Sequence, residues 1–224
     1  MDDLALILFD VNGTLVDSQS EILAAMHDAF AAIAQPVPNR DAILSTVGLS
    51  LEQAMMYLLP SESDAHTISA AVSTYKQSYR KSREAGAISV LYPGIADLLC
   101  KCRSHKNWLL GLATGRSRRG VNALVEYYDW GGVFQTIQTA DTHPSKPNPA
   151  MLQAALAETG ASAQRCLFIG DTTHDMQMAM AAPVGFVGVT WGYHPVDRFD
   201  AAFRVAETSQ SVYQAITDWL ERET

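Results

Sequence analysis

One apolar run that ends in a carboxylate constrains this chain more than any other stretch. Residues 4–9 read Leu-Ala-Leu-Ile-Leu-Phe, Asp10 follows directly, and Gly13 comes three residues later. A short continuous apolar run that ends at a turn signal is typical of a strand buried on both faces. Open α/β sheets carry their chemistry just beyond the carboxyl ends of such strands. Asp10 is therefore a candidate nucleophile and a candidate ligand of a hard cation.

Strand and helix patterns alternate in the second half of the chain. Further strands are expected at 108–113, 133–139, 166–170 and 184–189, with helices at 95–105, 118–128, 149–159, 173–182 and 209–222. Alternation of this kind predicts an α/β fold with a doubly wound parallel sheet, similar to the Rossmann fold.

Residues 17–86 follow a different pattern, with apolar positions at helical spacing and no expected strand. Helices are expected from Ser18 to Pro36, from Ile43 to Leu59 and from Ile68 to Arg83. We therefore predict an all-helical cap domain at 17–86, inserted into a core formed by 1–16 and 87–224.

Charge and cysteine content narrow the class of protein. Sixteen basic and 24 acidic residues give a net charge of 16 − 24 = −8, which disfavours nucleic-acid and anionic-membrane partners. Three cysteines without a Cys-x-x-Cys pattern indicate ordinary thiols rather than a disulfide framework. The first apolar run is too short for a signal peptide or a spanning helix. We expect a cytoplasmic monomer or homodimer.

Polar side chains follow several of the expected strands. Asp10, Thr114 and Asp171 each stand at a strand end, Lys146 follows the strand expected at 133–139, and Asp175 lies one helical turn after Asp171. The carboxyl ends of parallel strands share one sheet edge, so these groups are expected to converge. Carboxylates suit Mg²⁺, whereas a hydroxyl, a backbone amide and an ammonium suit a phosphate group. The set therefore favours phosphoryl transfer.

Four motifs in this order resemble those of the haloacid dehalogenase superfamily of phosphohydrolases. They are Asp10-Val11-Asn12-Gly13-Thr14, Ala113-Thr114-Gly115, Lys146-Pro147-Asn148-Pro149 and Gly170-Asp171-Thr172-Thr173-His174-Asp175. The helical block between the first and second motifs is similar to the cap of one branch of that superfamily. Leu91-Tyr92-Pro93-Gly94 at the cap exit makes the chain most similar to phosphoglycolate-phosphatase-like proteins.

The resemblance implies a Mg²⁺-dependent phosphatase that hydrolyses a small phosphorylated metabolite through an aspartyl phosphate. For the metal, the resemblance implies ligands at Asp10, which is also the nucleophile, at the backbone carbonyl of Asn12 and at Asp171, while Asp175 is a water-mediated ligand or a support of Lys146. For the phosphoryl group, it implies binding by Thr114, Gly115 and Lys146. It also implies a substrate-contacting cap loop around Gly48.

The chain departs from the family at Asn12, where these phosphatases usually carry an Asp that acts as general acid and base. An amide cannot exchange a proton in that role. Three explanations remain open: an engineered or natural Asp-to-Asn change in an ordinary phosphatase, a natural variant with another proton carrier, or a homologue that binds phosphate esters without efficient turnover. A scaffold with a vestigial site is a further alternative. Haloacid dehalogenases and phosphonate hydrolases resemble the chain less well.

Two groups near the motifs are candidates for the missing proton carrier. His174 lies beside Asp175, although it equally fits a helix-capping role, and Asp17 fits better as an anchor of the cap linker. The basic stretch Arg116-Ser117-Arg118-Arg119 follows the second motif. It is expected either to attract an anionic substrate or to form a solvated helix face.

Overall fold

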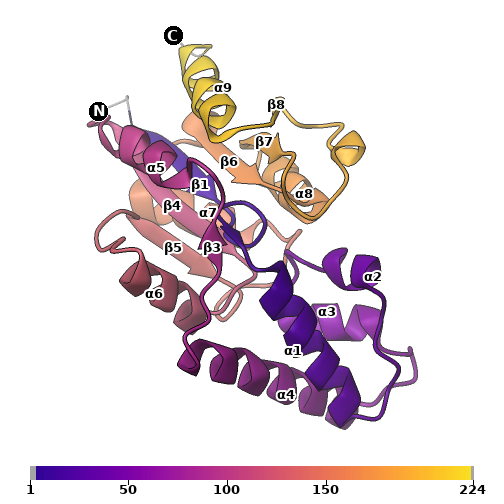
Figure 1. Ribbon diagram of the computed structural model, residues 1–224. Coiled ribbons are helices and arrows are strands. Elements are labelled where there is room, and N and C mark those ends of the chain that lie inside the picture. The colour runs from indigo at the N-terminus through magenta and orange to yellow at the C-terminus, as the bar shows by residue number, and fades with distance from the viewer. Residues whose placement is uncertain (1–3, 223–224) are drawn as a thin grey trace.

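A six-stranded parallel sheet forms the centre of the fold, as Figure 1 shows for the computed structural model, which describes residues 4–222. The strand order is β5-β4-β1-β6-β7-β8, and each neighbouring pair is parallel. The bounds are β1 Ala5–Phe9, β4 Trp108–Thr114, β5 Thr136–Thr139, β6 Cys166–Gly170, β7 Gly185–Val189 and β8 Arg204–Ala206.

Strand β1 is central, since it pairs with β4 on one side and β6 on the other. Phe9, its last residue, pairs with Leu112 and with Ile169, so the three strands end near one another. All five residues of β1 are fully buried. The apolar run was predictable because both faces of this strand are covered by helices.

Helices cover both faces of the sheet. The face of the sheet that carries Ile7 packs against α5 (Ile95–Arg103), α6 (Arg118–Tyr127) and α9 (Ser209–Glu221). Leu8 and the opposite face pack against α7 (Ala150–Thr159) and α8 (Thr173–Ala181). Helices α6, α8 and α9 each begin at a Ser or Thr whose side chain accepts a backbone N–H, which satisfies a donor of the first turn. The predicted doubly wound α/β core is confirmed.

Four helices form a separate group at one end of the molecule, at the lower right of Figure 1. They are α1 Gln19–Ala32, α2 Arg40–Leu44, α3 Leu51–Leu58 and α4 Ala65–Glu84, and we call them the cap helices. They enclose an apolar cluster of their own around Phe30 and Met55. The short antiparallel pair β2 (Val16–Asp17) and β3 (Val90–Leu91) joins them to the core. The domain limits 17–86 and 87–224 remain our proposal.

The cap differs from its sequence prediction in two places. The expectation of no strand within 17–86 is wrong at Asp17, which belongs to β2. The single helix expected from 43 to 59 is also wrong, because residues 45–50 form a loop between α2 and α3. The hydroxyl of Thr46 donates to the backbone carbonyl oxygen of Ile43, three residues earlier, at 2.7 Å, and Gly48 adopts a φ of +97. Both features interrupt a helix.

Two strands of the core differ as well. The strand expected at 133–139 begins only at Thr136, since Val133 N donates to Trp130 O in a preceding turn. Strand β8 was not expected, because its three residues Arg-Val-Ala carry too short a pattern to be recognised. Among residues 4–222, no helix is long and apolar enough to cross a membrane.

Candidate active site

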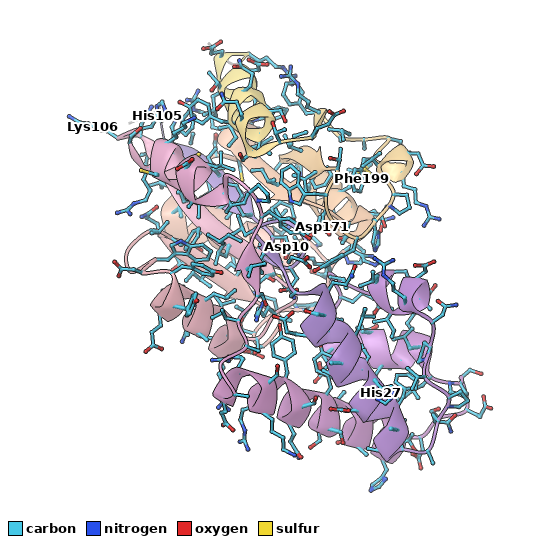
Figure 2. All side chains as sticks on the ribbon, in the orientation of Figure 1. Asp10, His27, His105, Lys106, Asp171 and Phe199 are labelled. Carbon is cyan, nitrogen blue, oxygen red and sulfur yellow. The ribbon has the colours of Figure 1, made fainter. Side chains whose placement is uncertain are left out.

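The ends of β1, β4 and β6 bring three predicted site residues together. Asp10, Thr114 and Asp171 lie at the carboxyl edge of the sheet and are each at most 1% exposed. Figure 2 shows Asp10 and Asp171 side by side where the core faces the cap helices. The expected convergence at one sheet edge is therefore present in the structure.

Three carboxylates and one ammonium form a buried cluster at this edge. One oxygen from each of Asp10, Asp171 and Asp175 lies within 4.8 Å of the others. Lys146 Nζ donates to Asp10 Oδ1 at 2.7 Å and to Asp175 Oδ1 at 2.6 Å. All four side chains are 1% exposed or less. A buried group with more carboxylates than cations attracts a further cation.

The pKa values of the cluster express this imbalance. Burial raises the pKa of Asp10 to about 6, which the ammonium of Lys146 opposes and the carboxylate of Asp175 reinforces. Burial and then the carboxylates of Asp175 and Asp10 raise the pKa of Asp171 well above its ordinary value. Burial acts to lower the pKa of Lys146, but Asp10 and Asp175 outweigh it and the net shift is upward. Lys146 therefore stays charged.

Backbone and hydroxyl donors fix the carboxylates that follow β6. Asp171 accepts from Thr14 Oγ1 at 2.8 Å and from the backbone of Tyr193 at 2.9 Å. Asp175 completes a capping box with Thr172 at the start of α8. Asp175 thus bonds Thr172 through Oδ2 and Lys146 through Oδ1. These contacts fit a support of Lys146 and leave the water-mediated role of Asp175 a prediction.

Gly13 allows the loop after β1 to pass directly over the cluster. Its φ of +87 lies in the left-handed region, and a Cβ on it would stand 2.1 Å from Asp171 Oδ2. Only glycine fits such an approach. The Asp10-x-Asn12-Gly13-Thr14 spacing therefore shapes the backbone around the carboxylates as well as supplying side chains.

The cap loop 45–50 rests on the second motif. A Cβ on Gly115 would stand 2.6 Å from Leu49 O and 2.8 Å from Gly48 O, so the two backbones touch. A Cβ on Gly48 would stand 2.9 Å from Thr172 Oγ1. The predicted substrate-contacting residues Gly48 and Gly115 therefore meet each other above the sheet edge.

Three polar contacts hold this loop on the core. The backbone N–H of Ser50 donates to Ser145 Oγ at 2.7 Å. His174 Nε2 and His194 Nε2 lie 3.3 and 3.2 Å from the carbonyl oxygen of Ser45. His194 Nδ1 accepts the backbone N–H of Thr173, so its proton is on Nε2 and donates to Ser45. Both histidines thus anchor the cap loop, and this use of His174 differs from proton transfer.

The Asn12 side chain is paired with Arg116. Arg116 Nη1 donates to Asn12 Oδ1 at 2.7 Å, and Nη2 donates to Tyr79 Oη of α4 at 3.0 Å. Arg116 is only 9% exposed, so of the two alternatives expected for the basic stretch, the solvated helix face is wrong for this residue, whereas Arg118 and Arg119 are exposed. The basic stretch was visible in the sequence, but the burial of Arg116 depends on two partners that are distant along the chain.

A cavity of about 690 Å³ lies between the cap helices and the sheet edge. Asp10, Asn12 and Thr114 line its floor, and Ile22, Met26 and Tyr75 of the cap line its apolar wall. Asp17 is exposed in β2 and, like His174, is not among the described residues that line the cavity. The two proton carriers considered from the sequence are therefore not brought into it.

Comparisons with known proteins agree on one family. The family model for haloacid dehalogenase-like hydrolase matches residues 7–189. A protein named probable phosphatase IndB from Dickeya dadantii is 35% identical over 88% of this chain and 86% of its own length. A phosphoglycolate phosphatase from Pseudomonas putida is 31% identical over 86% of this chain and 72% of its own.

Solved structures share the whole architecture. A putative phosphoglycolate phosphatase from Lactobacillus plantarum superposes with a TM-score of 0.82 at 26% identity, over 96% of this chain and 100% of that one. A putative haloacid dehalogenase-like hydrolase from Bacteroides fragilis gives a TM-score of 0.82 at 25% identity, over 93% and 99%.

Proposed function

The chain belongs to the haloacid dehalogenase-like hydrolases, and we propose that it is a Mg²⁺-dependent phosphatase that transfers the phosphoryl group to Asp10. The predicted class, a phosphoric monoester hydrolase, is confirmed by the family match and by the curated phosphatases that the chain resembles. The metal, the aspartyl phosphate and the substrate are parts of the proposal.

The buried cluster of three carboxylates and one lysine carries this proposal. Hard oxygen donors at this spacing, with raised pKa values at Asp10 and Asp171 and an excess of negative charge, fit a divalent cation. Asp10 and Asp171, with the backbone carbonyl of Asn12, would hold Mg²⁺. The metal would supply charge neutralisation for the phosphoryl oxygens.

The chain's own residues would perform the transfer around that cation. Asp10 Oδ attacks phosphorus, and the Lys146 ammonium keeps the carboxylate oriented and partly neutralises the phosphoryl group. The Thr114 hydroxyl and the Gly115 backbone amide bind phosphoryl oxygens at the end of β4. The cap loop on Gly115 excludes bulk water while the phosphoryl group is transferred.

The weakened homologue remains the second candidate, and the bond between Asn12 and Arg116 favours it. The amide oxygen is engaged by a guanidinium, and neither group takes or gives a proton near neutral pH. Phosphate binding would survive in such a protein while turnover falls by about 10²–10⁴-fold. A scaffold with a vestigial site would bind no phosphate at all.

The substrate is proposed to be a small phosphorylated metabolite, in line with the name of the Pseudomonas putida relative. A cavity of about 690 Å³ is within the range of sites that enclose drug-sized ligands, so leaving groups larger than glycolate belong among the candidates. A cytoplasmic location and a monomeric or homodimeric state complete the proposal.

Phosphate release from a panel of esters, with and without Mg²⁺, tests the function. The panel contains an aryl phosphate, phosphoglycolate, a sugar phosphate and a nucleoside monophosphate. We expect Mg²⁺-dependent release that is lost in Asp10→Asn and kept in Asp41→Asn, a carboxylate on the exposed cap surface. Stabilisation of the fold by inorganic phosphate without release supports the weakened homologue instead. Neither release nor stabilisation supports the scaffold.

A further inference from the structure

Arg116 is a nearly buried cation that has no carboxylate partner in the described chain. It is 9% exposed, and its hydrogen bonds go to the neutral oxygens of Asn12 and Tyr79. Its Nε is buried without any partner. Burying a guanidinium without a counter-charge is costly, so such a group indicates an anion in the working state.

Two further guanidiniums strengthen the positive field at this point. Burial and then the charges of Arg116 and Arg119 lower the pKa of Arg83, an effect that the carboxylate of Glu126 opposes. All three line the cavity, and none of them forms an ion pair among residues 4–222. By contrast, Lys76 and Arg80 of the same wall pair with Glu52 and Glu84.

Besides Asp10, two described carboxylates line this cavity, and both are engaged elsewhere: Asp141 accepts the backbone N–H of Arg118, and Glu52 is paired with Lys76. Asn12 presents an amide, Thr114 an aliphatic hydroxyl and Arg116 a guanidinium, none of which releases a proton near neutral pH. Because a guanidinium only donates, the atom of Asn12 that it contacts is the oxygen. Arg116 and Asn12 therefore present donors, not acids, to an oxygen that departs from a group bound at Asp10.

We propose that Arg116 is a catalytic residue that stabilises the departing oxygen as an anion, and that the site selects phosphate compounds of acidic hydroxyls, namely aryl, enol and acyl phosphates. The inference rests on the proposed function. Such oxygens leave without protonation, whereas an alkoxide would need an acid, which Asn12 and Arg116 do not supply. Donors aimed at developing charge are the largest single contribution in many active sites.

The chemistry balances without any further reactant. Asp10 Oδ forms a bond to phosphorus while the phosphorus–oxygen bond of the ester breaks, and its electron pair stays on the leaving oxygen beside Arg116. That oxygen takes its proton later from water, and the hydroxide left behind takes one proton from the dihydrogen phosphate formed in the second step. A water molecule then attacks phosphorus, the bond to Asp10 breaks, and both protons of the water depart with the phosphate as dihydrogen phosphate. Asp10 is regenerated as a carboxylate.

A leaving-group series tests the proposal. We would measure kcat/KM for phenyl phosphates that span the acidity from nitrophenol to unsubstituted phenol and on to an alkyl phosphate. The native chain is expected to discriminate steeply in favour of acidic leaving groups. Asn12→Asp supplies a proton carrier, so its rate should rise about 10²–10⁴-fold on the alkyl ester and less than about tenfold on the nitrophenyl ester.

Variants of the guanidiniums separate catalysis from structure. Arg116→Met is expected to lose about 10²–10³-fold, with a larger loss for phenyl than for nitrophenyl phosphate, and Arg116→Lys should recover part of it. Arg119→Met removes the same charge from the same cavity without a bond to Asn12, so any loss of rate should be equal on every ester and the leaving-group dependence should not change. Tyr79→Phe should leave the leaving-group dependence unchanged, and a steeper dependence would identify the phenol as the acid.

Equal leaving-group dependence in the native chain and in Asn12→Asp would overturn the proposal, as would an equal loss on every ester in Arg116→Met. Should Arg116→Met fail to fold, the comparison of the native chain with Asn12→Asp decides alone. Failure of the proposed function gives a different result, because no ester would then release phosphate with either chain.

Discussion

Substitution of Lys146 by Met should destabilise the protein more at neutral than at acidic pH. Lys146 Nζ bonds two fully buried carboxylates at 2.7 and 2.6 Å, and Met keeps the length of the side chain without its charge. Loss of one partner from a buried ion pair costs about 3–5 kcal/mol, because the remaining charges are left uncompensated. We expect a loss of this size at about pH 7.5, in the absence of a divalent cation.

The pH dependence follows from the raised carboxyl pKa. A carboxyl whose pKa is higher in the folded than in the unfolded protein favours folding at low pH, and this contribution is lost as the pH rises toward the folded pKa. Asp10 already titrates at about 6, and removal of Lys146 takes away the group that lowers its pKa. Between pH 6 and the new pKa, each pH unit increases the loss of unfolding free energy by at most about 1.4 kcal/mol. At about pH 5 the loss should therefore be about 2 kcal/mol smaller.

Urea unfolding followed by circular dichroism, at both pH values with and without MgCl₂, measures these differences. Mg²⁺ should restore part of the stability at the higher pH. The control is Lys76→Met, because Lys76 bonds Glu52 on the surface with both side chains more than half exposed, and its loss should cost at most about 1 kcal/mol at either pH. An equal cost of Lys146→Met at both pH values, insensitive to Mg²⁺, would refute the electrostatic account of the cluster.

Three further predictions concern the metal, the cap loop and the thiols. Mg²⁺ should raise the melting temperature less at about pH 5 than at about pH 7.5, because Asp10 and Asp171 must lose protons to bind it. The pKa of Asp10 is about 6 and that of Asp171 is also raised. An equal rise in melting temperature at both pH values would contradict this. Gly48→Ala should lower kcat/KM by more than about tenfold, because the added methyl group would collide with the core. Its control, Gly86→Ala, has a similar φ of +91 but lies in open space, so it should cost only backbone strain of about 1–2 kcal/mol. Similar losses of activity in the two variants would argue against docking of the loop. Cys100 alone should react with an alkylating reagent in the folded protein, because it is exposed while the other two cysteines are buried with raised thiol pKa, and mass spectrometry that finds more labelled sites would refute it.

The core of the fold was predictable because its physics is local in the sequence. The run before Asp10 is apolar at every position since β1 is buried on both faces, and the same holds for the strand at 166–170. Parallel strands then force Asp10, Thr114 and Asp171 to one edge, whatever the lengths of the helices between them. The convergence of the site therefore follows from strand order alone.

The cap loop could not be predicted in the same way. Apolar spacing continues through residues 43–59, so periodicity favours a single helix. Backbone bonding by the Thr46 hydroxyl and the left-handed conformation of Gly48 decide otherwise, and the loop is held by Ser145 and two histidines of the core. These partners lie 95, 129 and 149 residues away along the chain, where no local pattern records them.

Arg116 illustrates a further limit. Its position directly after the second motif was evident, yet a charged stretch at a helix start is usually solvated. Its burial follows from Tyr79, which α4 brings over the sheet edge, and from Asn12 at the end of the neighbouring strand. The raised pKa values of Asp10 and Asp171 likewise arise from burial and from the neighbouring carboxylates, which only the assembled cluster contains.

Detection of the phosphorylated residue decides whether Asp10 is the nucleophile. The protein would be mixed with nitrophenyl phosphate and Mg²⁺, quenched in acid and mapped by peptide mass spectrometry. We predict one phosphoryl group on Asp10, which accumulates because the Asn12 amide does not activate the attacking water, and which disappears without Mg²⁺ and in Asp10→Asn. Release of phosphate with Asp10 unmodified, or a phosphoryl group on another residue, would contradict it.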